Sequence, residues 1–245
     1  KEGTALSGSE QVNKENLPEI IAAVKKDKKA IVAPKRMRVT YTLTVDTNAV
    51  PAGKMIRCWL PYPRKDQSRQ TDVKFISASE PEYVFSPQDC RHSTLYMEKR
   101  AVKGEPTVFS ETFEYTSCGE WHNLRAEDVQ PYDTATALYK EYTAEREKHI
   151  IFSPRLRELA AKLTAGENNP YLKAKRIFRW VNDNFPWASA REYSTIENIP
   201  EYVLDNRHGD CGQVSLLFIT LCRISGIPVH FQSGFMMHPR AWNLH

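Results

Sequence analysis

The sequence predicts an α+β fold in which an antiparallel β-rich region precedes a largely helical one. Three observations favour this class. Apolar and polar residues alternate in short segments between residues 38 and 117, as in strands with one buried face. Two later segments open with Ser-Pro or Asn-Pro and then repeat apolar residues at helical spacing. A last apolar stretch follows Cys211 and ends at Gly226, which predicts a buried helix.

The N-terminal part, residues 1–34, is predicted to be a polar segment followed by an amphipathic helix. Residues 1–15 are polar and are expected to be loosely structured. The lysines of the helix are expected to form a solvated face rather than a binding patch. Its apolar residues recur at helical spacing within residues 17–29: Leu17, Ile20, Ile21 and Val24.

Residues 35–120 are predicted to form an antiparallel β-sandwich domain. Five segments with strand-like alternation are separated by Pro, Gly and Asp, and several short strands at such spacing are typical of a sandwich. The segments are RVTYTLTVDT, MIRCWLPYP, VKFISASEP, STLYMEKRAV and TVFSETFEYTS.

The third part, residues 121–245, begins with a connector over residues 121–151 that contains at most one helical turn. Two helices follow, because Ser153-Pro154 and Asn169-Pro170 are typical helix starts. Their apolar faces are Leu156, Leu159, Ala160 and Leu163 in the first, and Ala174, Ile177, Phe178 and Val181 in the second. We expect both to pack against the helix that follows Cys211, with the helices on one side of an antiparallel sheet.

The segment RHGDCGQVS places Cys211 where that last helix should begin, after Gly209 and Asp210, which suit a tight turn. A thiol in the first turn of a helix lies near the positive end of the peptide dipoles and near unpaired N–H groups. Both favour thiolate over thiol, so Cys211 is a candidate nucleophile. Cys222, in the middle of the helix, fits a buried structural cysteine better.

Histidine is the side chain that most commonly supplies a base to such a thiol at neutral pH. His230 lies in a segment, Val229 to Phe235, that alternates like a strand, and we expect it to pack or to form hydrogen bonds. His238 lies in the turn MMHPR and is a reserve base. His245 closes the segment RAWNLH, which could start a further strand.

Composition limits the function classes. The chain of 245 residues is 41% hydrophobic and 26% charged, which is typical of globular proteins. Its net charge of +4 is too small to favour a nucleic-acid surface, and no apolar run is long enough for a transmembrane segment. The first residue is Lys1 rather than Met. This leaves the compartment open and favours a secreted or periplasmic protein with a processed N-terminus.

Five cysteines form an odd set without a CxxC pair, which disfavours both a disulfide framework and a structural zinc site. A Cys90–Cys118 disulfide and free thiols at these positions both stay open. We expect no metal, because the residues that could gather round zinc lack the usual short ligand spacing: His208, Cys211, His230, His238 and His245.

The C-terminal residues resemble a known family. RHGDCGQVSLLFITLCRISGIPVHFQSGF, followed by AWNLH, is similar to the transglutaminase-like superfamily in its GDC element, the helix after it, GIP with an alternating strand, and a later histidine. The resemblance covers roughly the last hundred residues and implies a papain-type core with a Cys, His and Asp triad that transfers acyl groups from amides, without a cofactor. It matches Cys211 to the nucleophile and His245 to the base.

Two positions depart from the family pattern. His230 stands where the family usually has a basic residue, and the triad acid would lie on a strand that follows His245. We therefore expect the natural polypeptide to continue past His245 with the missing strands.

A β-rich segment often precedes cores of this superfamily. Substrate presentation and support are both open as its role, and we favour support.

An acyl-transfer intermediate also needs hydrogen-bond donors for its oxyanion. The backbone N–H of Cys211 can supply one, because first-turn amides have no partner within the helix. Trp187 and Tyr193 are candidates for a second donor or a substrate contact, although both also fit ordinary core or rim aromatics. Gln213 is a further candidate, and its position also fits the helix surface.

The resemblance therefore implies a cysteine-dependent enzyme that acts on a peptide or protein amide through a thioester. Hydrolysis by a peptidase or amidase is the reaction we favour. Protein-glutamine transglutaminase activity is one alternative. A transglutaminase-like domain that no longer catalyses and serves as a binding or scaffold module is the other.

Overall fold

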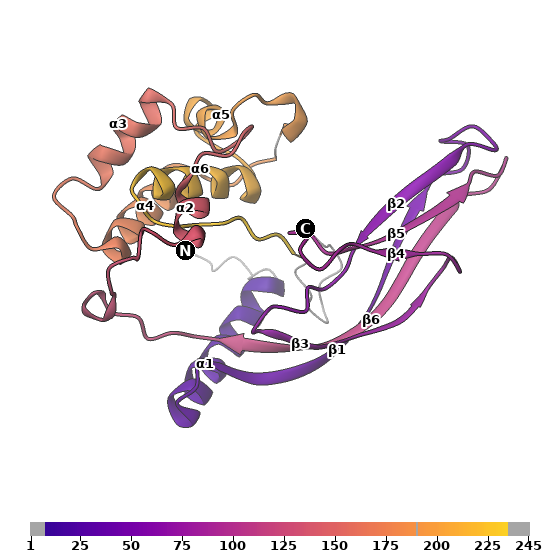
Figure 1. Ribbon diagram of the computed structural model, residues 1–245, viewed down its shortest axis with the longest axis horizontal. Helices are drawn as coiled ribbons and strands as arrows, with labels where there is room; N and C mark the ends of the chain where they lie inside the picture. The colour runs from indigo at the N-terminus through magenta and orange to yellow at the C-terminus, as the bar shows by residue number, and fades with distance from the viewer. Residues whose placement is uncertain (1–7, 190, 235–245) are drawn as a thin grey trace, which may run out of the picture. The chain divides into compact units, whose positions relative to one another are not determined.

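The computed structural model describes residues 8–189 and 191–234. Its chain divides into two units, the first ending at His122 and the second starting at Asn123 (Figure 1). The first unit contains antiparallel sheets and the second contains helices, so the predicted α+β class is confirmed. The finer description of the first unit as a sandwich stays a prediction.

Six strands of the first unit form two antiparallel sheets, with strand orders β1-β6-β3 and β2-β5-β4. The five segments that alternate in the sequence all contain a strand, and the two-residue strand β4 is additional. The strands are β1 (Ile31–Val45), β2 (Met55–Pro61), β3 (Gln70–Ala78), β4 (Val84–Phe85), β5 (Thr94–Arg100) and β6 (Thr107–Glu120).

Helix α1 (Gly8–Asp27) packs against β1 and β6. It starts well before the residues that show helical apolar spacing, so the loose structure expected for residues 8–15 was wrong. Glu, Gln and Lys are frequent in this stretch and have high helix propensity. Propensity therefore extends the helix where the apolar pattern gives no signal.

The core of the first unit comes from both sheets, because alternate residues of each strand point to the same face. Phe109 on β6 is fully buried and packs against side chains of β2 and β5. An aromatic group of Tyr62, Phe75, Phe85 and Phe113 extends this core. The core residues are Cys58, Leu60, Leu95, Met97 and Phe109.

Glu111 is an exception in this core. It follows Phe109 by two residues on β6 and so shares its buried face, and only 1% of it is exposed. Neither carboxyl oxygen has a hydrogen-bond partner among the described residues. Burial raises the pKa of Glu111 to about 8. Burial, and then the nearby Glu111 charge, raise the pKa values of Cys58 and Tyr62.

We expect the stability of the first unit to fall as pH rises from about 5 to about 8. Between these values the folded protein keeps a proton on Glu111 that the unfolded chain releases, since the ordinary pKa is 4.5 and the folded value about 8. The slope should reach at most about 1.4 kcal/mol per pH unit. Urea unfolding at pH 5.5, 7 and 8.5 measures it.

The variant Glu111→Gln should lack this slope, because its neutral amide cannot titrate. Glu105→Gln, a change at an exposed turn residue, is the matched control and should retain the slope. Equal slopes for Glu111→Gln and the unchanged protein would show that Glu111 does not carry the proton.

Among the described residues of the second unit, the regular secondary structure is helical, apart from isolated bridges. The predicted helix starts at Ser153-Pro154 and Asn169-Pro170 are confirmed, and both Ser153 and Asn169 cap their helices. Helices α2 and α5 were not predicted, and the connector contains more helix than one turn. The elements are η1 (Ala126–Asp128), α2 (Ala137–Thr143), α3 (Pro154–Leu163), α4 (Pro170–Asn184), η2 (Tyr193–Thr195), α5 (Ile199–Asn206) and α6 (Cys211–Ile224).

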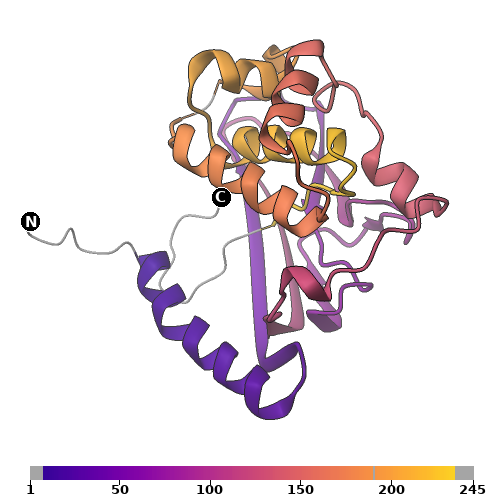
Figure 2. The ribbon, with the colours of Figure 1, turned by 90° about the vertical axis from the view of Figure 1, so that its left-hand side faces the viewer.

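Helix α6 is the central element of the second unit and packs against α2, α3, α4 and α5 (Figure 2). Leu217, Leu221 and Cys222 have no exposed surface. Burying a side chain of leucine size stabilises a fold by roughly 1.5–3 kcal/mol. The contacts of α3 and α4 with α6 confirm the predicted packing of these two helices against the helix after Cys211.

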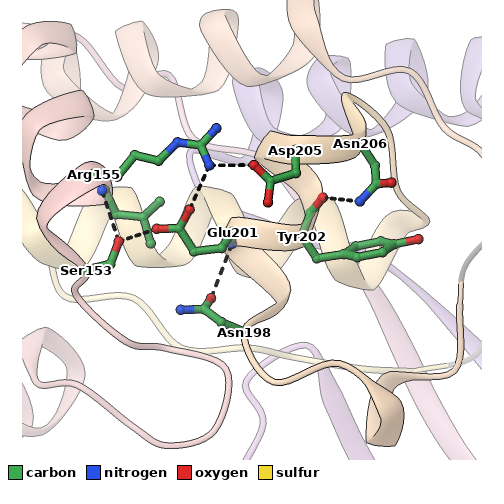
Figure 3. Close-up of polar contacts among 8 residues, drawn as sticks. Ser153, Arg155, Asn198, Glu201, Tyr202, Asp205 and Asn206 are labelled. Carbon is green, nitrogen blue, oxygen red and sulfur yellow. Dashed lines mark hydrogen bonds and ion pairs between the residues drawn. The ribbon is translucent and has the colours of Figure 1, made fainter.

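A polar network joins the start of α3 to α5 (Figure 3). Glu201 accepts hydrogen bonds from the Ser153 hydroxyl and, at 3.0 Å, from Arg155. Arg155 also contacts Asp205 at 2.6 Å. Asn198 caps α5 by accepting the backbone N–H of Glu201 at 3.2 Å. These contacts fix α5, the helix from which the chain turns towards Cys211.

The predicted strand from Val229 to Phe235 is wrong for residues 229–234, which the structure describes as irregular. A strand needs a partner strand, whereas the backbone of Val229 is paired in another way. Its N–H donates to the carbonyl of Tyr142 at 3.0 Å, and its carbonyl accepts from Arg223 at 2.8 Å. Phe235 lies outside the described residues.

Residues 207–210 connect α5 to α6, and Gly209, which was expected in a tight turn, forms a bridge with Trp187 instead. Arg207 ends α5 in the left-handed region, with φ of 60°. Asp210 is the N-cap of α6, and its side chain accepts the backbone N–H of Gln213 at 2.8 Å.

All five cysteines are free, including Cys90 and Cys118. None of the described helices is both long and apolar enough to cross a membrane.

We expect Asp210→Ala to destabilise the second unit by about 1 kcal/mol, because Ala cannot cap α6. Asp210→Asn should lose much less, since an amide oxygen still accepts a hydrogen bond at this position. Thermal unfolding of the two variants at neutral pH measures the difference. Equal losses would show that the cap adds little.

Candidate active site

Cys211 is the first residue of α6 and is exposed. The side chain of Asp210 takes the N–H of Gln213, whereas the first-turn amides of Cys211 and Gly212 have no partner within the helix. The sulfur therefore lies where backbone N–H groups and the helix dipole favour negative charge, as the sequence predicted.

The carboxylate of Asp210 has a second donor, the hydroxyl of Tyr193, which lies 17 residues earlier in the chain. Burial raises the pKa of Tyr193 above its usual range, and the hydrogen bond to Asp210 and the charges of Asp210 and Cys211 raise it further. The phenol therefore stays protonated at physiological pH and acts as a donor.

Gly212 allows Tyr193 to approach the helix start this closely. A Cβ at position 212 would overlap the Tyr193 hydroxyl. Any larger residue would push either the ring or the helix start away. The absence of a side chain at position 212 is thus a condition for the contact between Tyr193 and Asp210.

Gln213 is fully buried, so its expected place on the helix surface was wrong. Its side-chain amide turns inward, and Nε2 donates to the carbonyl of Arg191 at 3.1 Å. Its Oε1 has no hydrogen-bond partner among the described residues. Gln213 therefore holds the segment that contains Tyr193 against α6.

Trp187 reaches the site through its backbone. Trp187 and Gly209 form an isolated parallel bridge, in which the N–H of Ala188 donates to the carbonyl of Gly209 at 3.0 Å. The Trp187 side chain is 68% exposed. The structure thus brings the three candidate contact residues, Trp187, Tyr193 and Gln213, to the start of α6.

The predicted base His245 and the reserve base His238 lie outside the described residues. His230 is exposed, its ring centroid lies 5.1 Å from that of Tyr142, and its Nδ1 lies 3.3 Å from the carbonyl of Phe231. In His208, Nδ1 lies 2.8 Å from the carbonyl of Asn206. No group of three His, Cys, Asp or Glu side chains within residues 8–189 and 191–234 is arranged to hold a metal ion.

Sequence reasoning missed the role of Asp210, although a signal was available. Asp at the residue before a helix, with Gln three residues later, resembles a capping box. The structure contains only half of this motif, because the Gln213 side chain bonds Arg191 instead of returning to the Asp210 N–H. No local signal indicates that Tyr193 would reach Asp210.

Two surface pockets among the described residues are lined by other parts of the chain. One lies in the first unit, beside Tyr62, Phe75 and Phe85. The other lies in the second unit, beside Leu159 and Trp180. Cys211 lines neither of them.

Comparison with solved structures shows a related fold. A candidate cysteine protease from Cytophaga hutchinsonii is 17% identical and superposes with a TM-score of 0.56 over 81% of this chain. The chain spans 66% of that protein. A candidate protease from Parabacteroides distasonis is 12% identical, with a TM-score of 0.28, over 80% of this chain and 56% of its own. No curated protein matches the chain.

A family model supplies the remaining comparison. The model of the transglutaminase-like superfamily core matches residues 157–245, from within α3 to the last residue. This range includes both Cys211 and His245. The predicted resemblance is therefore confirmed: residues 157–245 are similar to the core of the transglutaminase-like superfamily.

Proposed function

We propose that the protein is a cysteine-dependent enzyme that cleaves amide bonds through a thioester on Cys211. One observation carries this proposal: Cys211 is exposed at the first residue of a buried helix, next to backbone amides without a partner in the helix. The family match over residues 157–245 supports it. So does the fold shared with a candidate cysteine protease.

In the proposed reaction, the Cys211 thiolate attacks the amide carbonyl and forms a tetrahedral intermediate. The backbone N–H of Cys211 donates to the oxyanion. His245, the base that the resemblance implies, takes the proton of the Cys211 thiol and donates it to the leaving amine as the C–N bond breaks. Water then attacks the thioester, releases the carboxylic acid and returns the thiol.

Hydrolysis is the reaction we favour, as a peptidase or amidase on a peptide or protein. Attack on the thioester by an amine instead of water would make the protein a transglutaminase. A domain without either reaction would serve as a binding or scaffold module. Thiol labelling and a casein assay distinguish these three functions.

We expect iodoacetamide to label Cys211 several-fold faster than Cys90 at pH 7, because the backbone N–H groups at the start of α6 favour the reactive thiolate. Cys90 is the matched internal control, since it is also exposed. Cys222 should label slowest, because burial raises its pKa to about 12. Peptide mass spectrometry over time gives each rate. Equal rates at Cys211 and Cys90 would contradict the activated thiol.

We expect the protein to release new amino termini from casein, and Cys211→Ala or His245→Ala to lower this rate by about 10³-fold or more. Incorporation of a fluorescent amine, dansylcadaverine, into the same casein measures transglutamination in parallel. Cys90→Ala, at an exposed cysteine, is the control and should keep the activity. Activity that survives Cys211→Ala would overturn the proposal, whereas casein binding without either reaction would favour the scaffold module.

A further inference from the structure

The position of Asp210 creates an electrostatic difficulty for the proposed function. Its carboxylate belongs to the residue immediately before Cys211, and a nearby negative charge opposes formation of a thiolate. The helix start favours a thiolate at the same sulfur. The balance depends on where the Asp210 charge is held.

The structure holds that charge with two donors from different parts of the chain. The N–H of Gln213 donates to Oδ1 of Asp210 at 2.8 Å, and the Tyr193 hydroxyl donates to the same oxygen. Hydrogen bonds to an ionised acceptor are roughly twice as strong as neutral ones and take up part of its charge. Tyr193 remains protonated, and so remains a donor, because burial raises its pKa.

Other polar side chains, in the segment around Tyr193 and in the segment before Asp210, have hydrogen-bond partners other than Asp210. Arg191 donates to Thr195, Glu192 accepts from Ser194, and Arg207 donates to Asn184. His208 pairs with the carbonyl of Asn206. In the described part of the site, Asp210 precedes Cys211 directly in the chain, and the charge of Cys211 acts on Tyr193.

We propose that Tyr193 is a positioning residue that acts through Asp210. It holds the carboxylate in its capping position on α6 and takes up part of the negative charge that would otherwise oppose the Cys211 thiolate. This inference rests on the proposed function. It assigns Tyr193 a role different from a direct contact with the oxyanion, because its proton is engaged by Asp210.

A double-mutant cycle with Tyr193→Phe and Asp210→Asn tests this proposal. The readout is the pH midpoint of iodoacetamide labelling at Cys211, with Cys90 as internal reference. Tyr193→Phe removes only the hydroxyl and should raise the midpoint by about 0.5 pH units, which slows labelling at pH 7 about threefold. In the Asp210→Asn background the same substitution should leave the midpoint unchanged, because no charge remains to be shielded.

Two results would overturn the inference. Either Tyr193→Phe leaves the midpoint unchanged in the unaltered protein, or it shifts the midpoint equally in both backgrounds. The second result would mean that Tyr193 acts only on the structure of the loop. Tyr139→Phe is the matched control, because it removes a tyrosine hydrogen bond to the carbonyl of Gly226 in the same unit. It should not shift the midpoint.

A second variant disrupts the contact between Tyr193 and Asp210 without changing either of these residues. Gly212→Ala places a methyl group where the Tyr193 hydroxyl lies, so it should raise the midpoint in the same direction. Circular dichroism establishes that each variant is folded.

The cycle also separates this inference from the proposed function. Normal casein cleavage with no midpoint shift would overturn the role of Tyr193 alone. Absence of cleavage, with Cys211 no more reactive than Cys90, would overturn the function and still leave the midpoints measurable.

Discussion

The burial of α6 is the constraint on which the second unit depends. Its apolar side chains contact four other helices, and Leu217, Leu221 and Cys222 are removed from solvent entirely. A helix that is fixed on several sides has little freedom to shift along or about its axis. Its first residue, Cys211, is nevertheless exposed. The packing of the helix in the core therefore fixes the position of an exposed cysteine.

A buried helix of this kind must also satisfy its polar groups. The Thr220 hydroxyl donates to the carbonyl of Leu216 at 2.8 Å, within the helix. Arg223 is 4% exposed and donates to the carbonyls of Ala144 and Val229. These bonds join α6 to segments that lie far before it and just after it. The polar residues of α6 thus fix the chain around the helix in the way that its apolar residues fix the helix itself.

The parts of this structure that the sequence predicted are those with local signals. Helix starts at Ser153-Pro154 and Asn169-Pro170 depend on neighbouring residues alone, and they were found. Strand pairing for residues 229–234 depends on a partner that no local pattern supplies, and that prediction was wrong. The contact between Tyr193 and Asp210 joins η2 to the N-cap of α6, 17 residues later in the chain, and no local pattern indicates such a contact.

Two carboxyl groups of this protein show why the site relies on donors rather than on burial. Glu111 is buried without a partner among the described residues, and its pKa rises to about 8, so near pH 7 it is held mainly as a neutral acid. Burial of Asp210 without a hydrogen-bond partner would likewise favour its neutral form and remove the negative charge next to Cys211. A protonated carboxyl, however, is a poorer acceptor for the helix N–H groups, and the cap of α6 would weaken. In the structure, hydrogen bonds from Tyr193 and Gln213 instead hold the Asp210 side chain in its capping position on α6.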